Sequence, residues 1–293
     1  MSEHMILVTG ATGKTGRGVV DLLRDRGVEC RAASRQAEVR FDWDDDGTWP
    51  AAIEGVEAVY MVLTDLGTAE GTGKAVRFAR MVAAAGGARI VLVATPDDGT
   101  DFSDEVRATE RSITAAGLRL TSLRLRWLHQ NFSEDFLRPA VMAGALRLPA
   151  GDGREAFVDA DDVAAVAVEI LTDPRHDKGA YDLTGPRSIG FSDVADTLTR
   201  AIGREIRYVP ITPDEFVSEQ ISSGTPAEWA SVSCGLYQDI ASGKLDMISS
   251  DVEAVLGRPP RDFADFAESA ARHGAWRASP NDVSSTDRQG DPE

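Results

Sequence analysis

The sequence predicts an α/β protein built on a Rossmann doubly wound parallel sheet, and two observations support this fold class. Short apolar segments alternate with helical segments through the first half of the chain, a pattern typical of βαβ units. The first apolar segment, Met5–Thr9, runs directly into GATGKTG, where Gly10, Gly13 and Gly16 are spaced three residues apart. The second half is less regular and mainly helical in pattern.

The composition fits a soluble globular protein and limits its partners. The 293 residues are 42% hydrophobic and 27% charged, with a net charge of −17. No apolar segment reaches the roughly 18–20 residues that cross a bilayer, and the N-terminal segment lacks a signal-peptide pattern. We therefore expect a cytoplasmic protein. The acidic charge argues against nucleic acid or a membrane as partner, because phosphate groups need a basic patch; we expect a small-molecule substrate.

No metal site is expected from the sequence. Cys30 and Cys234 lack a CxxC spacing or a histidine-rich neighbourhood. The three carboxylates at residues 44–46 fit a solvated helix entry better than an ion site, because consecutive carboxylates do not easily converge on one ion.

The first half contains the predicted elements of the sheet. Apolar runs predict strands, and the amphipathic stretches between them predict helices. The predicted strands are Met5–Thr9 and residues 29–33, 39–41, 58–63, 88–95 and 118–125, and the predicted helices are residues 13–25, 48–53, 73–85 and 103–116. Right-handed crossovers would join these strands in parallel.

The second half is predicted to be mainly helical. The predicted helices are residues 132–145, 160–171, 191–202, 213–223, 226–242, 249–256 and 263–274, with short strands at 157–159 and Ala180–Leu183. From residue 277 the chain is polar and lacks periodicity, so residues 277–293 are predicted to be a disordered tail.

The glycine motif predicts a dinucleotide-binding loop, with a tight turn without ligand as the alternative. Gly10 permits a sharp turn, Gly13 lets the backbone approach a pyrophosphate, and Gly16 allows close packing of helix and strand. The following helix presents free N–H groups and the positive end of its dipole to the phosphates. Additional hydroxyl donors would come from Thr9, Thr12 and Thr15.

The residues at the end of the second predicted strand indicate whether the cofactor is NAD(H) or NADP(H). An acidic residue there would bind the ribose 2′-hydroxyl of NAD, but this chain has Ser34 and Arg35, with Lys14 in the glycine motif. Two cations and a hydroxyl suit a 2′-phosphate, which arginine can bind through paired hydrogen bonds. We therefore predict NADP(H), with a solvated surface charge as the alternative for Arg35. Asp42 and Trp43 follow the third strand, where they would bind and flank the adenine.

Eight segments, taken in order, resemble the NmrA-like family of atypical short-chain dehydrogenases/reductases, in the branch similar to NADPH quinone reductases and ergot-alkaloid reductases. These segments are VTGATGKTGRGVV, AASR, RFDWDDDGTW, GVEAVYMV, TSLRLRWLHQNF, FVDADDVAAVAVEIL, YDLTGP and LGRPPRDFADFA. The resemblance implies an NADP(H)-binding Rossmann domain over residues 1–130, with 155–184 packing back onto it. It also implies a smaller, mainly helical substrate domain over residues 131–154 and 185–276, and a cleft between the two.

The chain departs from the family's catalytic pattern. Short-chain dehydrogenases commonly carry Tyr-x-x-x-Lys at the start of the helix after the fifth strand, where the tyrosine protonates the carbonyl oxygen and the lysine lowers its pKa. The matching positions here are Phe102 and Val106, and no Tyr or Lys lies between Lys74 and Lys178. Neither Phe102 nor Val106 can transfer a proton.

Without this pair, ordinary ketone reduction lacks an acid for the developing alkoxide. Hydride transfer to a quinone, an iminium or an enone is easier, because the acceptor is positively charged or delocalises the incoming charge. We therefore expect an NADPH-dependent quinone or natural-product reductase. A non-catalytic NADP(H) sensor that acts through a protein partner, or a non-redox cyclase or epimerase, are the alternatives, and a homodimer remains open.

Candidate site residues follow the predicted strands, whose carboxyl ends bind ligands in open α/β sheets. Leu63 and Thr64 follow the fourth strand, and Thr95 at the end of the fifth is expected to bind the nicotinamide or substrate. His129 is the candidate proton donor, because the pKa of histidine lies near neutrality. The alternative is that His129 packs in the core or lies at the surface without a catalytic role. The candidate substrate-binding residues are Trp127, Asn131, Trp229 and Tyr237.

Overall fold

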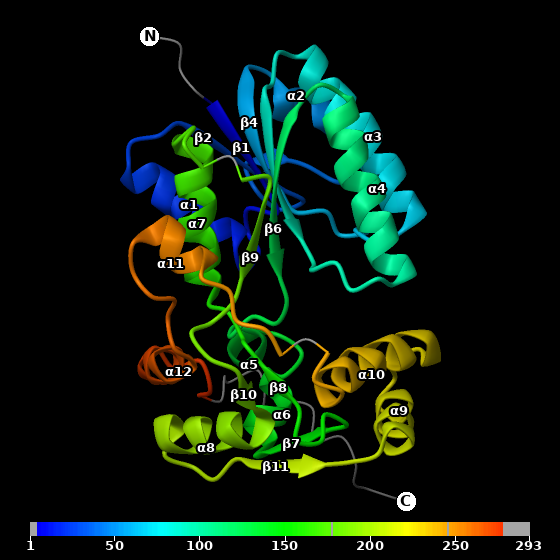
Figure 1. Ribbon diagram of the computed structural model, residues 1–293, viewed down its shortest axis with the longest axis vertical. Coiled ribbons are helices and arrows are strands. Elements are labelled where there is room, and N and C mark those ends of the chain that lie inside the picture. The colour runs from blue at the N-terminus through cyan, green and yellow to red at the C-terminus, as the bar shows by residue number, and fades with distance from the viewer. Residues whose placement is uncertain (1–4, 177, 245, 278–293) are drawn as a thin grey trace, which may run out of the picture. The chain divides into compact units, whose positions relative to one another are not determined.

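The computed structural model describes residues 5–176, 178–244 and 246–277, and the chain divides into two compact units (Figure 1). Unit 1 comprises Met1–Leu128, Ala156–Ser188 and Met247–Arg261, and unit 2 comprises His129–Glu155, Ile189–Asp246 and Asp262–Glu293. The predicted tail lies outside the described residues, apart from Arg277. Among the described residues, no helix combines the length and apolar character that crossing a membrane would require.

Unit 1 contains a seven-stranded parallel sheet with the strand order β3-β2-β1-β4-β5-β6-β9. The strand order reverses at β1 and β4, and open sheets of this type bind ligands at the carboxyl ends beside such a reversal. The predicted Rossmann sheet is confirmed. The strands are β1 (Met5–Thr9), β2 (Cys30–Ser34), β3 (Val39–Arg40), β4 (Val56–Met61), β5 (Arg89–Ala94), β6 (Arg119–Leu125) and β9 (Ala180–Leu183).

Helices cover both faces of this sheet (Figure 1). The helices α1 (Gly16–Asp25) and α7 (Ala160–Thr172) enclose an apolar core that includes the fully buried Tyr60. The helices α2 (Trp49–Ile53), α3 (Ala69–Ala84) and α4 (Asp101–Ala115) enclose a second core that includes Trp49 and Phe78. Burying apolar side chains on both faces is what allows a parallel sheet to be stable, since neither face can remain in water. The short helix α11 (Asp251–Leu256) also belongs to unit 1.

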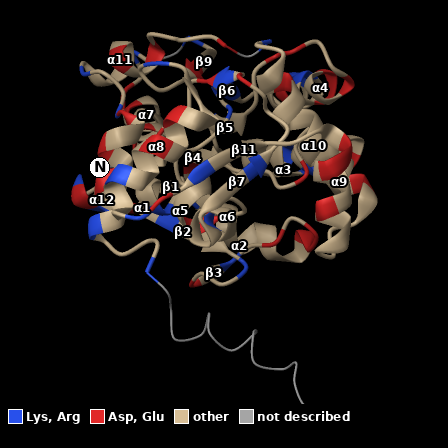
Figure 2. Cartoon of the chain, turned by 90° about the horizontal axis from the view of Figure 1, so that it is seen from below, with Lys and Arg blue, Asp and Glu red and all other residues tan. Residues whose placement is uncertain are grey.

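Unit 2 is mainly helical. It contains a parallel strand pair, β7 (Ala145–Leu148) with β11 (Arg207–Pro210), and an antiparallel pair, β8 (Arg154–Glu155) with β10 (Ile189–Gly190). Its helices are α5 (Asn131–Glu134), α6 (Arg138–Ala143), α8 (Phe191–Ile202), α9 (Pro213–Ser222), α10 (Ala227–Ala241) and α12 (Phe263–Arg272). Acidic and basic residues are interspersed along the elements of each unit (Figure 2).

Two local predictions are wrong. Residues 157–159 do not form a strand, because only Val158 pairs, in an isolated bridge with Leu128. The helix predicted at 132–145 is broken after α5, where Asp135 adopts an extended conformation, and its last residue begins β7. The four strands of unit 2 were not predicted.

Candidate functional site

The glycine loop, residues 10–15 between β1 and α1, folds tightly on its own backbone. Gly10 has φ +61°, and the Gly13 N–H donates to the Gly10 carbonyl at 2.8 Å. A Cβ atom on Gly16 would lie 2.2 Å from that same carbonyl oxygen, which no side chain could tolerate. Thr9 joins β1 to the β4 side of the reversal, because its hydroxyl accepts from the Val62 N–H at 2.9 Å.

This loop fits the pyrophosphate of a dinucleotide. Gly13 is exposed, so the backbone is open to a ligand on the side where a side chain would otherwise project. Thr15 is the N-cap residue of α1, yet its hydroxyl makes no capping hydrogen bond. The Thr15 side chain therefore does not block an anion at the start of the helix, although the Arg17 N–H already donates to the Gly13 carbonyl at 3.2 Å. Thr12 is exposed, Lys14 is half-buried and Thr15 is buried beside the loop.

β2 ends at Ser34, Arg35 follows it in the chain, and Arg40 lies beside Ser34 on the neighbouring strand. Ser34 is buried, and its hydroxyl accepts from the Gln36 N–H at 3.2 Å. Arg35 is exposed, as a ligand for a phosphate must be. In the parallel register, Ser34 pairs with Arg40 of β3. Sequence reasoning missed Arg40, because the pairing of β2 with β3 cannot be read from an isolated two-residue strand.

The two residues predicted near the adenine have well-defined packing. Trp43 is buried and makes edge-to-face contacts with Phe41 and Phe78, at centroid distances of 4.9 and 5.1 Å. Its indole N–H donates to the Val62 carbonyl at 2.9 Å. The Asp42 carbonyl accepts from the indole N–H of Trp49 at 2.8 Å. The aromatic cluster thus fixes the loop after β3, whereas direct contact of either residue with adenine stays a prediction.

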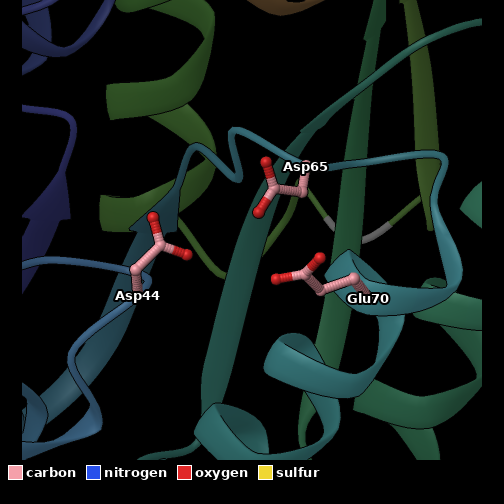
Figure 3. Close-up of side chains that lie close together, drawn as sticks. All are labelled: Asp44, Asp65 and Glu70. Carbon is pink, nitrogen blue, oxygen red and sulfur yellow. The ribbon is translucent and has the colours of Figure 1, made fainter.

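Three carboxylates surround one buried lysine, Lys74. Figure 3 shows the three carboxylates. Asp44 follows β3, Asp65 follows β4, and Glu70 lies in the first turn of α3. The Lys74 ammonium binds Asp44 at 2.5 Å, Glu70 at 3.0 Å and also Asp65, and its side chain is only 6% exposed. Hydrogen bonds to Asp44 and Asp65 raise the pKa of Lys74. The ammonium therefore supplies the positive charge that these carboxylates would otherwise lack.

The aspartate loop, residues 42–46, is more strongly paired than its sequence predicts. Asp44 binds Lys74, Asp46 binds Arg77 at 3.0 Å, and Asp45 lies 3.8 Å from Arg40. Each of three consecutive carboxylates thus has a cation from another element. The prediction of a solvated helix entry is incomplete, because the sequence shows the acidic run but not its remote partners.

Candidate residues also follow β4 and β5. Leu63 is buried, and Thr64 is exposed. The Thr95 hydroxyl is buried and has no hydrogen-bond partner among the described residues. An unsatisfied buried hydroxyl costs free energy unless water or a ligand supplies a partner. This state of Thr95 suits the predicted contact with nicotinamide or substrate.

The first turns of α4 hold Phe102 and Val106, the two residues predicted to stand where the family commonly has a tyrosine and a lysine. Phe102 is 45% exposed, and a Cβ on Gly67 would lie 2.1 Å from its ring, so the ring packs directly on that glycine. Val106 is buried in the core beneath α3 and α4. Neither position offers a proton donor.

The remaining candidates divide between the units. Trp127 of unit 1 is buried against Phe157, with ring centroids 6.4 Å apart. In unit 2, His129 is fully buried and packs on Phe263 and Phe266, at 5.2 and 5.1 Å. This packing favours the structural interpretation of His129, whose role as a proton donor stays a prediction.

The other unit 2 candidates differ in exposure. Asn131 and Tyr237 are buried, whereas Trp229 on α10 is 64% exposed. Burial raises the pKa of Tyr237, which packs on Phe191 and Phe216. Tyr237 is therefore a poor acid in this environment, and Trp229 offers an open aromatic surface.

Together, the glycine loop, the reversal of strand order and the basic end of β2 define a dinucleotide-binding α/β protein. The chain belongs to the NmrA-like family, whose model matches residues 2–266. The predicted family is thereby confirmed.

Relatives of known activity share nearly the whole chain. An NAD(P)H azoreductase from Xenophilus azovorans is 32% identical over 290 residues, covering 92% of this chain and 100% of the relative. Agroclavine dehydrogenase from Claviceps fusiformis is 29% identical over 280 residues, covering 89% of this chain and 95% of the relative. Both relatives are named as redox enzymes, and the name of the first includes its cofactor NAD(P)H.

Solved structures share the fold. An NADPH-dependent quinone oxidoreductase from Escherichia coli, solved in complex with NADPH, matches with a TM-score of 0.74 at 22% identity. The match covers 90% of this chain and 99% of the other. The predicted combination of a Rossmann sheet and a mainly helical C-terminal region is confirmed.

Proposed function

We propose that the protein is an NADPH-dependent reductase that transfers hydride to an electron-poor small molecule such as a quinone, an iminium or an enone. One observation carries the choice of acceptor. The first turns of α4 hold Phe102 and Val106, which cannot donate a proton. An acceptor that requires no strong acid at this position is therefore favoured.

The nearest upstream tyrosine and lysine do not replace the missing pair. Tyr60 is fully buried in the core beneath α1 and α7, and this burial raises the pKa of its hydroxyl. Lys74 is bound by three carboxylates, which hold it in the charged form. Both side chains therefore have structural roles in unit 1.

The chain's own residues would then bind and orient the reactants. A reduced nicotinamide supplies the hydride when it is bound. The Thr95 hydroxyl, which has no partner among the described residues, would hydrogen-bond the nicotinamide or the acceptor. An iminium is neutralised by the hydride it receives, and a quinone delocalises the charge until water protonates it. Orientation can therefore supply much of the rate enhancement.

The preference for NADPH over NADH belongs to the same proposal. Ser34 and Arg35 lie at the end of β2, where an acidic side chain would favour NADH. An exposed guanidinium beside a hydroxyl suits a phosphate monoester.

Turnover with a panel of acceptors tests the proposal. NADPH oxidation is measured with a benzoquinone, a naphthoquinone, a cyclic iminium and an enone, and NADPH fluorescence titration measures binding independently. We expect binding together with rapid oxidation by at least one acceptor class. Binding without oxidation by any acceptor would contradict the reductase and favour a sensor or a non-redox enzyme.

A further inference from the structure

A second arginine lies beside the predicted 2′-phosphate ligands. Arg40 pairs in register with Ser34, and Val39 pairs with Ala33. Ala33 and Val39 pack against the core beneath α2 and α3. Because side chains alternate along strands, Ser34 and Arg40 point to the opposite face of the sheet. A hydroxyl and a guanidinium therefore share one face at the end of β2.

Arg40 is the least constrained cation of the aspartate loop. Its only ion pair in the described part of the chain is with Asp45 at 3.8 Å, and these side chains are 68% and 50% exposed. By contrast, Lys74 contacts Asp44 at 2.5 Å and Arg77 contacts Asp46 at 3.0 Å. At 3.8 Å the Arg40 pair is too long for a hydrogen bond, so the donors of its guanidinium remain available to another anion.

We propose that Arg40 binds the 2′-phosphate of NADP(H) together with Ser34 and Arg35, and that Asp45 competes with the phosphate for Arg40. This inference rests on the proposed use of NADPH and adds a residue that determines cofactor specificity. A phosphate monoester carries up to two negative charges and three acceptor oxygens, and two guanidinium groups match it better than one.

If Asp45 competes with the phosphate, substitutions of Arg40 and Asp45 should change NADPH affinity in opposite directions. Arg40→Gln removes a ligand of the phosphate and weakens NADPH binding. Asp45→Asn removes the competing charge and strengthens it, since Arg40 then has no carboxylate partner. Asparagine can still cap the turn at residues 46–48, where the Asp45 carboxylate accepts from the Gly47 N–H at 3.2 Å. The loop is therefore expected to keep its conformation.

Calorimetric titration of the full chain tests the proposal without turnover. The probes are NADP+ and NAD+, with 2′,5′-ADP and 5′-AMP as fragments that lack the nicotinamide. For Arg40→Gln we expect about 10- to 100-fold weaker binding of NADP+ and 2′,5′-ADP, as for a lost charge-assisted hydrogen bond. NAD+ and 5′-AMP should change less than about 2-fold. For Asp45→Asn we expect about 2- to 5-fold tighter binding of the two phosphorylated probes.

Arg77→Gln is the matched control, because Arg77 is also exposed and paired with an aspartate of the same loop. It should leave the ratio of NADP+ to NAD+ affinity unchanged. If the wild-type protein binds NADP+ well and Arg40→Gln binds it equally well, the proposed role of Arg40 is overturned. The proposed use of NADPH is not affected by that result. If the wild-type protein binds none of the phosphorylated probes, the proposed function and this inference both fail.

Discussion

The glycine loop and the aspartate loop both follow strands of unit 1, but different forces hold them. The glycine loop is fixed by backbone sterics, since Gly16 has no room for a Cβ and Gly10 requires positive φ. The aspartate loop is fixed by ion pairs and indole hydrogen bonds from β3, β4 and α3. The conformation of the glycine loop depends on glycines, which have no Cβ. The conformation of the aspartate loop depends on side chains from elements that are remote in the sequence.

This difference sets how each loop responds to substitution. Added atoms in the glycine loop occupy the space of the ligand or of the backbone, so the response is close to all-or-none. The ion pairs around the aspartate loop are several and partly exposed, so the loss of one is shared by its neighbours. Predictions for the two loops should therefore differ in size and in kind.

The largest effect is expected for Gly13→Val. The new Cβ would lie 3.1 Å from the Gly10 carbonyl oxygen, so the loop would have to shift by a few tenths of an ångström, and the side chain would occupy the exposed side of the loop. Several charge-assisted hydrogen bonds to the pyrophosphate, each of about 1.5–3 kcal/mol, would be lost. We expect NADPH and NADH binding to fall together by more than about 100-fold in fluorescence titration.

The control for this prediction is Gly235→Val on α10, where a Cβ would meet no atom within 4 Å. It should bind NADPH like the wild-type protein. Retained binding in Gly13→Val would mean that the pyrophosphate does not lie on the glycine loop.

A smaller effect is expected for Lys74→Met, which keeps most of the apolar stem and removes the ammonium. Three carboxylates whose oxygens lie within 4.8 Å of one another would then repel. Asp44 and Glu70 are mostly exposed and can be hydrated, which limits the cost. We expect the free energy of unfolding to fall by about 1–3 kcal/mol. Urea denaturation followed by tryptophan fluorescence would report it, because Trp43 lies in the loop and Trp49 packs on it.

The pH dependence of this effect follows from the raised pKa of Lys74. A raised pKa means that the stabilisation is fully present below the ordinary pKa of lysine and is lost only as pH rises through the raised value. The difference between Lys74→Met and wild type should therefore be constant from pH 6 to 9. Lys178→Met, which removes an exposed lysine with one aspartate partner, should cost less than about 1 kcal/mol. Equal costs for the two would contradict the central role of Lys74.

The same contrast explains what the sequence could predict. The glycine loop was readable because Gly10, Gly13 and Gly16 follow one another within a single strand–loop–helix unit. Helix α8 (Phe191–Ile202) was predicted with its observed bounds, since its apolar residues recur with a helical period. The Lys74 cluster was not readable, because Asp44, Asp65 and Lys74 come together only when β3, β4 and α3 are placed in the fold. The pairing of Arg40 with Ser34 was missed for the same reason.

The smallest effect is expected for Asp46→Asn. Its partner Arg77 and Asp46 itself are about half exposed, so water screens the pair and replaces its hydrogen bond. Arg77 also lies over the Trp49 ring, 5.8 Å from the centroid, and this contact survives the substitution. We expect the free energy of unfolding to change by less than about 0.5 kcal/mol, with unchanged NADPH affinity. A cost as large as that of Lys74→Met would mean that the exposed pair holds the aspartate loop as firmly as the buried ammonium does.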